Sequence, residues 1–338
     1  DVLVPAAMPR YTYKELWKAT QGFHHKARVG RGGFSVVYKG RLKQANTDGS
    51  MCEVAIKRLN KEGLRKSDEF FLEIKMINTL QHPRLVNLKG WCYEKGEAML
   101  VYQFMSNGSL ADHLFGKGNS TMLTSEIRVE ILKGVAEALN HLHAAGAVHR
   151  DVKAANVLLT SDFKAMLGDF GLLRLLKDDN HITQTMTAAG TPGYAAPELL
   201  FTRTPTDKVD VFSYGALALE LACGRRVIDP RLDHPEERML LDWVWSKHES
   251  GALPSVLDPR MDISGEMETM WRCILHLALH CCHPIPEERP QMHEVLDTIL
   301  HGIVVPLDPS RPSYHGPYSS WGQTPSIQMS SSFTPKTL

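Results

Sequence analysis

The stretch HRDVKAAN at residues 149–156 decides how this sequence is interpreted. The carboxylate of Asp151 can accept the proton of a hydroxyl group, and the amide oxygen of Asn156 can ligate a metal ion. Thirteen positions after Asn156 stands the triplet DFG, residues 169–171, whose Asp169 offers a hard oxygen ligand to a cation such as Mg²⁺. The two motifs together predict a site where a carboxylate base lies close to a bound metal ion.

Three further motifs accompany this pair. GRGGFSVV at residues 30–37 has the small residues that let backbone amides approach phosphate oxygens. VAIK at residues 54–57 ends in Lys57, which can pair with nucleotide phosphates if Glu73 orients it from the following helix. APE at residues 196–198 closes the segment after DFG. Hairpin glycines, a surface lysine and loop carboxylates would explain single motifs, but five motifs in this order favour phosphate chemistry on a nucleotide.

The composition limits the classes of partner. The chain has 338 residues, 43% of them hydrophobic, and its 38 basic and 38 acidic residues cancel. We therefore expect a folded protein. Because its net charge is zero, it has no overall attraction to nucleic acid, and recognition of a partner depends on a local site. Six cysteines do not form the disulfide framework of a small secreted domain, which favours a reducing cytosolic setting.

The apolar pattern predicts no membrane span and two regions of different structure. Even the apolar run at residues 216–223 contains Glu220. The chain begins at Asp1 without a signal peptide, so we expect a piece of a longer protein. The pattern first predicts a hairpin at 36–42 and 53–59 and a helix at 67–80. It then predicts strands at 85–93 and 99–104 and a long helix at 125–145, which Gly146 ends.

This order predicts an α+β fold with a small antiparallel-sheet lobe carrying one helix, followed by a larger and mainly helical lobe. The small lobe would extend to about residue 102 and the large lobe would begin at about residue 106. A leader at residues 1–23 is expected to pack on the folded domain at 24–304. Residues 305–338 are rich in Ser and Pro, and we expect a flexible tail there.

In their order and spacing, the five motifs resemble those of the eukaryotic protein kinases, over about residues 24–304. The resemblance implies a bilobal kinase fold, ATP as phosphoryl donor, Mg²⁺ with Mn²⁺ as an alternative, and proteins as substrates. It implies catalytic roles for Asp151, Lys153, Lys57 and Glu73, with Lys153 steadying the transferred phosphate, and metal ligation by Asn156 and Asp169.

The resemblance also implies which residues bind the nucleotide and which hold the scaffold. Adenine would lie between Val37, Ala55 and Leu158, with Tyr102 as gatekeeper and backbone hydrogen bonds from Gln103 and Met105. The expected ATP-binding residues are Val29, Gly30, Arg31, Gly32, Gly33, Phe34, Ser35, Val36, Val37, Ala55, Lys57, Tyr102, Gln103, Met105 and Leu158. The expected structural residues are Phe170, Gly171, Glu198, Asp210 and Arg289, with Arg289 paired to Glu198.

One position departs from the family pattern. Ser35 stands where the glycine-rich loop has its third glycine. A left-handed backbone there would cost a residue with a side chain about 1 to 2 kcal/mol, so we expect weaker closure over ATP. Ser35 is the one feature that supports a non-catalytic scaffold, or pseudokinase, as the competing interpretation.

Other features bear on specificity and regulation. Lys153 within HRDVKAAN and Thr191 within GTPGY match the pattern of serine/threonine kinases. This similarity disfavours a tyrosine kinase. We expect activation by phosphorylation at Thr183, Thr185 or Thr187, with Arg150 binding the phosphate, although solvated loop threonines would explain the pattern as well. The cluster His276, His280, Cys281, Cys282 and His283 could suggest zinc, but its apolar neighbours favour a buried helix.

A narrower resemblance lies outside the catalytic motifs. YKEL at residues 13–16, GWC at 90–92, ACGRR at 222–226 and LDWVW at 241–245 resemble plant receptor-like kinases, most of all the legume-type (L-type) lectin group. The resemblance implies a parent receptor with one membrane helix and this domain on the cytosolic side of the plasma membrane. Co-receptor kinases would then be candidate partners.

Overall fold

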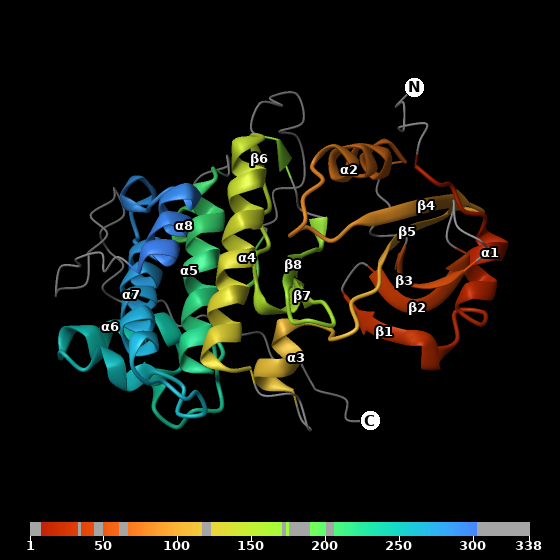
Figure 1. Ribbon diagram of the computed structural model, residues 1–338. Helices are drawn as coiled ribbons and strands as arrows, with labels where there is room; N and C mark the ends of the chain where they lie inside the picture. Colours follow the sequence, from red (N-terminus) through yellow and green to blue (C-terminus); the bar gives the residue numbers. More distant parts are fainter. Residues whose placement is uncertain are drawn as a thin grey trace.

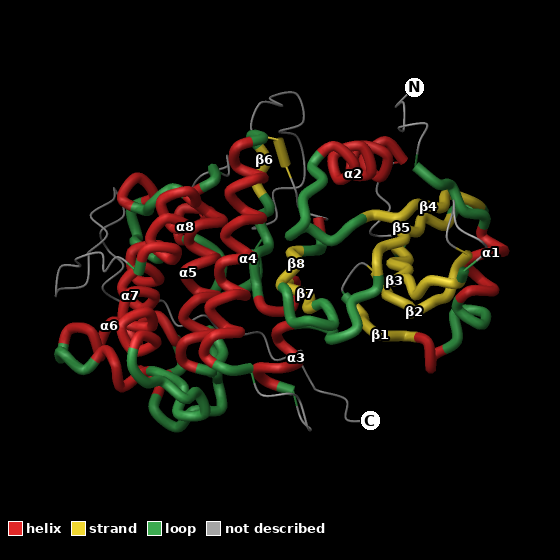
Figure 2. Tube along the Cα trace, in the orientation of Figure 1, coloured by secondary structure: helices red, strands yellow, loops and turns green. Residues whose placement is uncertain are grey.

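Two lobes make up the protein. A computed structural model describes residues 8–32, 35–43, 50–60, 67–116, 123–170, 174–175, 190–200 and 206–302. Figure 1 shows a lobe built on a sheet at the right, the N-lobe, and a helical lobe at the left, the C-lobe. The tube in Figure 2 separates the strand-rich side from the helix-rich side in the same way. This arrangement confirms the predicted α+β class with a small sheet lobe and a larger helical lobe.

The N-lobe is an antiparallel sheet of five strands in the order β1-β2-β3-β5-β4, with helix α2 lying along it (Figure 1). The elements of this sheet lobe are β1 Arg28–Arg31, β2 Ser35–Lys43, β3 Met51–Leu59, α2 Ser67–Thr79, β4 Leu88–Glu94 and β5 Glu97–Gln103. In β3, Val54 and Ile56 are buried and alternate with less buried neighbours, as a strand with one face on a core requires. The hairpin, the helix and both later strands were expected from sequence, whereas β1 was not.

The leader packs on the outer side of this sheet. Its helix is α1 Tyr13–Ala19, and the short 3₁₀ helix η1 His25–Ala27 follows it before β1. Thr12 and Glu15 form a capping box at the start of α1, in which each side chain accepts the backbone N–H of the other residue. Leu16 of α1 is fully buried against β3, β4 and β5. Ahead of α1, Tyr11 donates its N–H to the Trp91 carbonyl at 2.8 Å, which fastens the leader to β4.

The C-lobe is built around two long helices. Its first elements are α3 Leu110–Phe115, α4 Ser125–Ala144, β6 Ala147–Val148, η2 Ala154–Asn156, β7 Val157–Leu159, β8 Ala165–Leu167 and β9 Arg174–Leu175. Its later elements are η5 Pro197–Leu200, α5 Lys208–Cys223, η6 Pro235–Glu237, α6 Leu240–Glu249, η7 Leu253–Val256, α7 Glu266–Cys281, η8 Pro286–Glu288 and α8 Met292–His301.

Burial explains why these helices form the centre of the lobe. Every side chain of α5 from Val209 to Cys223 is buried, so this helix has no solvent-facing side. In α4 the side chains of Ile131, Val135 and Leu139 have no exposed surface, and Gly146 at φ +71° ends the helix region as expected. No helix within the described ranges is long and apolar enough to cross a membrane.

Candidate active site

The segment 149–156 lies between β6 and β7, and a buried carboxylate holds its first part in place. Asp210, on the first turn of α5, has no exposed surface. It accepts the backbone N–H of His149 at 2.8 Å and that of Arg150 at 2.7 Å, and His143 Nε2 lies 3.0 Å from the same carboxylate. Arg150 has a left-handed backbone, φ +71°, which these bonds stabilise. These bonds place the Asp210 carboxylate where it can hold the start of this loop.

His149 joins this loop to the DFG region. Its Nε2 lies 3.1 Å from the Gly168 carbonyl, and its Nδ1 accepts the Asp151 N–H at 3.3 Å. Burial lowers the pKa of His149, so the imidazole is neutral, with the proton on Nε2 where it can be donated to Gly168. The ring also meets the buried ring of Phe170 edge to face at 5.7 Å. Phe170 thus lies in the core, as expected, whereas Gly171 falls outside the described residues.

Three side chains hold the carboxylate of Asp151 in one orientation. Lys153 Nζ lies 2.7 Å from Oδ2, the Asn156 amide donates to the same oxygen at 2.8 Å, and the Thr191 hydroxyl donates to Oδ1 at 2.8 Å. Lys153 also donates to the Thr191 hydroxyl at 2.9 Å. The Asp151 and Lys153 side chains are 12% and 22% exposed, so both can be reached from solvent. The structure thus gathers three residues predicted for the site, and adds Thr191 as a direct contact.

Lys57 of β3 and Asp169 meet where the lobes join. The Lys57 ammonium lies 2.6 Å from Asp169 Oδ1. Burial raises the pKa of Asp169 and is the largest single effect. The charge of Lys57, its hydrogen bond and the weaker effects of His149 and Lys153 together outweigh burial, so the net pKa lies below the usual aspartate value. Asp169 is therefore ionised at neutral pH. The side chain of Glu73, predicted to orient Lys57 from α2, lies outside the described residues.

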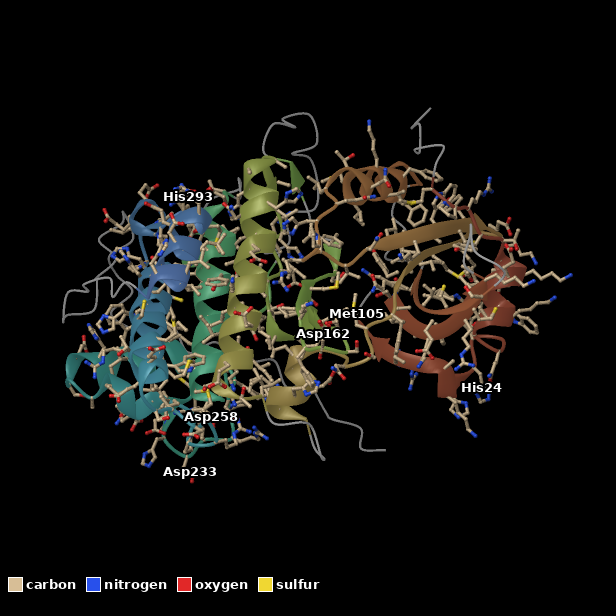
Figure 3. The ribbon with its side chains drawn as sticks, in the orientation of Figure 1. His24, Met105, Asp162, Asp233, Asp258 and His293 are labelled. Atoms are coloured by element: carbon tan, nitrogen blue, oxygen red, sulfur yellow. The ribbon has the colours of Figure 1, made fainter. Side chains whose placement is uncertain are left out.

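The residues predicted to hold adenine lie on both sides of this junction. Ala55 of β3 pairs in register with Tyr102 of β5, and Val37 of β2 pairs with Lys57. Leu158 of β7 is half-buried against the C-lobe core. Figure 3 labels Met105 between the two lobes.

The backbone of this connection shows which groups could face a purine. Gln103 donates its N–H to the Asn87 carbonyl at 3.0 Å, so a hydrogen bond to adenine would use its carbonyl. The Met105 carbonyl accepts the Gly108 N–H at 3.2 Å. The Met105 N–H is therefore the group that could donate a hydrogen bond to adenine.

The glycine-rich segment is partly described. Gly30, Arg31 and Val29 lie in β1, Gly32 follows β1, and Ser35 and Val36 lie in β2, whereas Gly33 and Phe34 fall outside the described residues. Ser35 pairs with Leu59 in extended conformation and has no left-handed backbone. The steric reason for weaker loop closure is therefore absent at Ser35, which corrects that expectation.

The expected ion pair between Glu198 and Arg289 is present and buried. Two hydrogen bonds of 2.6 and 2.8 Å join the guanidinium to the carboxylate. The Arg289 side chain has no exposed surface and that of Glu198 has 10%. Arg289 also donates to the carbonyls of His283, Lys208 and Pro284, which satisfies its remaining donors. The pair ties the segment that ends in APE to the loop before α8.

The cluster at 276–283 behaves as a helix core. Cys281 and Cys282 are buried, and burial raises the pKa of Cys282 to about 12. A protonated thiol is a poor zinc ligand because metal binding requires the thiolate. His276 lies against His248 of α6 instead, with ring centroids 5.5 Å apart. These contacts support the buried-helix interpretation.

Comparison with known proteins identifies the class. A family model described as protein tyrosine and serine/threonine kinase matches residues 23–299. The chain belongs to this protein kinase family, and the resemblance drawn from its five motifs is confirmed.

Its relatives are plant receptor kinases. In Arabidopsis thaliana it is similar to probable L-type lectin-domain containing receptor kinase S.7, with 42% identity, and to L-type lectin-domain containing receptor kinases VIII.1 and V.7, with 40% and 43%. These alignments cover 87%, 91% and 87% of this chain, but 43%, 43% and 44% of the relatives. The chain therefore spans less than half the length of these relatives.

Proposed function

We propose that this kinase domain transfers the γ-phosphoryl group of ATP to serine and threonine hydroxyls of proteins. The observation that carries the proposal is the shared contact of Lys153 and Thr191 with the Asp151 carboxylate. Thr191 brings the backbone of the segment at 190–194 close to the base. A short serine or threonine hydroxyl reaches the base only if the substrate backbone also comes close, whereas a tyrosine hydroxyl stands several ångströms further out.

The roles of the charged residues follow from where their atoms lie. Asp151 accepts the proton of the substrate hydroxyl. As it does so, the oxygen of that hydroxyl bonds to the γ-phosphorus, and the bond from the γ-phosphorus to the leaving oxygen of ADP breaks. The Lys153 ammonium lies beside the same carboxylate and stabilises the negative charge on the transferred group. Lys57 is assigned to the phosphates that remain on the nucleotide, with Glu73 as its orienting partner.

The donor atoms near Asp151 suit a hard divalent cation. Asp169 is ionised, and both amide N–H groups of Asn156 are used by Asp151, which directs the amide oxygen elsewhere. Carboxylate and amide oxygens are the ligands that Mg²⁺ prefers, and Mn²⁺ accepts the same set. Asp169 and Asn156 would hold the ion, which would neutralise charge on the phosphates when bound.

The remaining assignments concern regulation and context. We propose autophosphorylation in the segment after DFG, at Thr183, Thr185 or Thr187, all of which lie outside the described residues. Alanine at all three positions should abolish any rise in activity on preincubation with ATP. We also assign the domain to the cytosolic side of a plasma-membrane receptor, with co-receptor kinases as candidate partners, on the strength of the relatives' names.

Phosphoamino-acid analysis tests the proposed specificity. The chain is incubated with γ-labelled ATP and Mg²⁺ on a basic protein that contains serine, threonine and tyrosine. We expect label on serine and threonine. Label on tyrosine alone would contradict the specificity while leaving the kinase class intact, and ATP binding without any transfer would support the scaffold alternative.

A further inference from the structure

The leader and the segment that follows it, up to the end of β1, concentrate positive charge in a chain whose charges otherwise balance. Residues 8–31 contain six Lys or Arg and one acidic residue, against 38 and 38 in the whole chain. We define the leader face as the exposed side chains of Arg10, Lys14, Trp17, Lys18 and Lys26. Trp17 is 47% exposed, although its indole is large and mostly apolar. The net charge of this surface is therefore positive, whereas the net charge of the whole chain is zero.

Acidic neighbours do not neutralise this face. Among the described residues, no ion pair involves Arg10, Lys14, Lys18 or Lys26. Among the described carboxylates on this side of the N-lobe, Glu97 pairs with Arg58 at 2.6 Å and Glu53 pairs with Lys39 at 2.8 Å. Glu15 and Glu94 accept hydrogen bonds from the neutral groups of Thr12 and Tyr13 and keep their negative charge. The four cations of the leader face outnumber these two carboxylates, so the face keeps an excess of positive charge that can attract an external anion.

The backbone of α1 holds three of these side chains on one outward face. Lys14, Trp17 and Lys18 are three and four residues apart on α1, which places them together on a helix. Leu16 fixes the opposite side of α1 in the core, so this face points away from the sheet. Figure 1 shows α1 at the end of the N-lobe farthest from the C-lobe helices. In Figure 3, His24 is labelled at the lower outer edge of the N-lobe, close to the start of β1.

We propose that the leader face docks the kinase domain on an anionic lipid surface. Lysine and arginine near such a surface are attracted by its negative potential, and an indole at its edge suits the boundary between headgroups and acyl chains. A single exposed indole among cations provides little apolar area for a protein interface, whose buried core is usually depleted of charge. Charge complementarity therefore favours the membrane surface over an acidic protein.

Docking in this orientation is compatible with catalysis. The leader face and the site around Asp151 and Lys57 are at different ends of the N-lobe, because the site lies where the lobes join and α1 lies at the far end (Figure 1). A membrane in contact with α1 would leave that junction open to ATP and protein substrates. The proposal adds a binding function to the kinase activity and does not depend on it.

Cosedimentation with vesicles tests the proposal. The whole chain is mixed with large vesicles of phosphatidylcholine alone, or of phosphatidylcholine with phosphatidylserine. We expect binding to the mixed vesicles only, and a steep loss of binding as salt rises from about 0.1 M to about 1 M, because the screening length falls from about 10 to about 3 Å. The double variant Lys14→Gln/Lys18→Gln should bind about 30-fold more weakly, since each basic residue near the surface contributes about fivefold.

A matched control separates this face from total charge. Lys164→Gln/Arg272→Gln removes two exposed positive charges from the C-lobe, and should bind like the unchanged chain. Equal melting temperatures and equal kinase activity in solution would show that both variants are folded. Trp17→Phe should weaken binding several-fold and reduce the quenching of tryptophan fluorescence by brominated lipid.

Three results would overturn the proposal. The first is the absence of binding to the mixed vesicles at low salt. The second is binding that the control variant loses as strongly as the leader variant does, because total charge would then explain it. The third is binding to polyglutamate that Lys14→Gln/Lys18→Gln abolishes, without binding to vesicles, which would assign the leader face to an acidic protein.

Discussion

The Lys57 ammonium and the Asp169 carboxylate lie 2.6 Å apart and link the sheet of the N-lobe to the C-lobe. If Asp169 also holds the metal ion, Asp169→Asn removes the charge that both Lys57 and the cation need. We expect kcat/KM to fall by about 100-fold or more, since a metal supplies several kcal/mol of charge stabilisation. Initial rates across a Mg²⁺ titration measure this loss.

Asp162→Asn is the matched control for this substitution. Asp162 lies in the nearby turn between β7 and β8 and forms an exposed pair with Lys164 at 2.8 Å. Exposed pairs contribute little, so activity should stay within about twofold of the unchanged chain. Equal losses in the two variants would show that the negative charge of Asp169 has no special role.

Thr191 tests whether the hydroxyl bridge between Lys153 and Asp151 positions the base. Thr191→Val keeps the shape and removes the hydrogen bonds, so we expect kcat to fall by about 100-fold with little change in the KM for ATP. Thr191→Ser keeps the hydroxyl and should retain most of the activity. Similar kcat values for the valine and serine variants would exclude this positioning role.

The buried pair between Glu198 and Arg289 should dominate the stability of its region. Glu198→Gln leaves the fully buried Arg289 guanidinium without its counter-charge, which costs about 3 to 5 kcal/mol in other proteins. The free energy of unfolding in urea measures the loss. Glu287→Gln, an exposed change close by, should alter stability by about 0.5 kcal/mol or less. A Glu198→Gln variant as stable as this control would contradict the assignment.

Glu220 predicts a dependence of stability on pH. It is buried in α5, accepts the Tyr194 hydroxyl and accepts the Val227 N–H at 3.0 Å. Burial raises its pKa from 4.5 to about 7, while the bonds from Tyr194 and Val227 and the charge of Arg226 act in the opposite direction. Between these two values the native state keeps a proton that the unfolded state has lost.

The stability that Glu220 contributes is therefore complete below pH 4.5 and is lost as pH rises toward 7. Glu220→Gln removes this titration. Between pH 5 and pH 8 we expect the unchanged chain to lose about 2 to 3 kcal/mol more unfolding free energy than the variant, as urea denaturation would measure. Parallel pH profiles for the two proteins would show that Glu220 is ionised throughout.

Local patterns explain how much of the fold could be predicted. The apolar stripe of α4 and the position of Gly146 specify that helix and its end, and the bounds agree with the structure to within one residue. Strand β1 was missed because its sequence RVGR, at residues 28–31, has no alternating apolar pattern. Its position depends on pairing with β2, a tertiary contact that the local sequence does not encode.

The residues of the candidate site that belong to sequence motifs could be predicted. The motif residues gave the carboxylates, the lysines and Asn156, but not the contact between Thr191 and Asp151, which are 40 positions apart. The bond between His143 and Asp210 was missed for the same reason, since nothing near His143 marks it as polar and inward-facing. Burial of Glu220 could have been suspected from its apolar surroundings, but its partner Tyr194 could not.

Replacement of the proposed base is the most direct test of catalysis. Asp151→Asn keeps the size of the side chain and its place between Lys153, Asn156 and Thr191, but removes the carboxylate that accepts the proton. Phosphate incorporation from γ-labelled ATP with Mg²⁺ is compared for the unchanged chain, Asp151→Asn and Asp162→Asn, all with equal melting temperatures. We expect incorporation by the unchanged chain and by Asp162→Asn, and none above background by Asp151→Asn. Undiminished incorporation by Asp151→Asn would contradict the proposed role of the site.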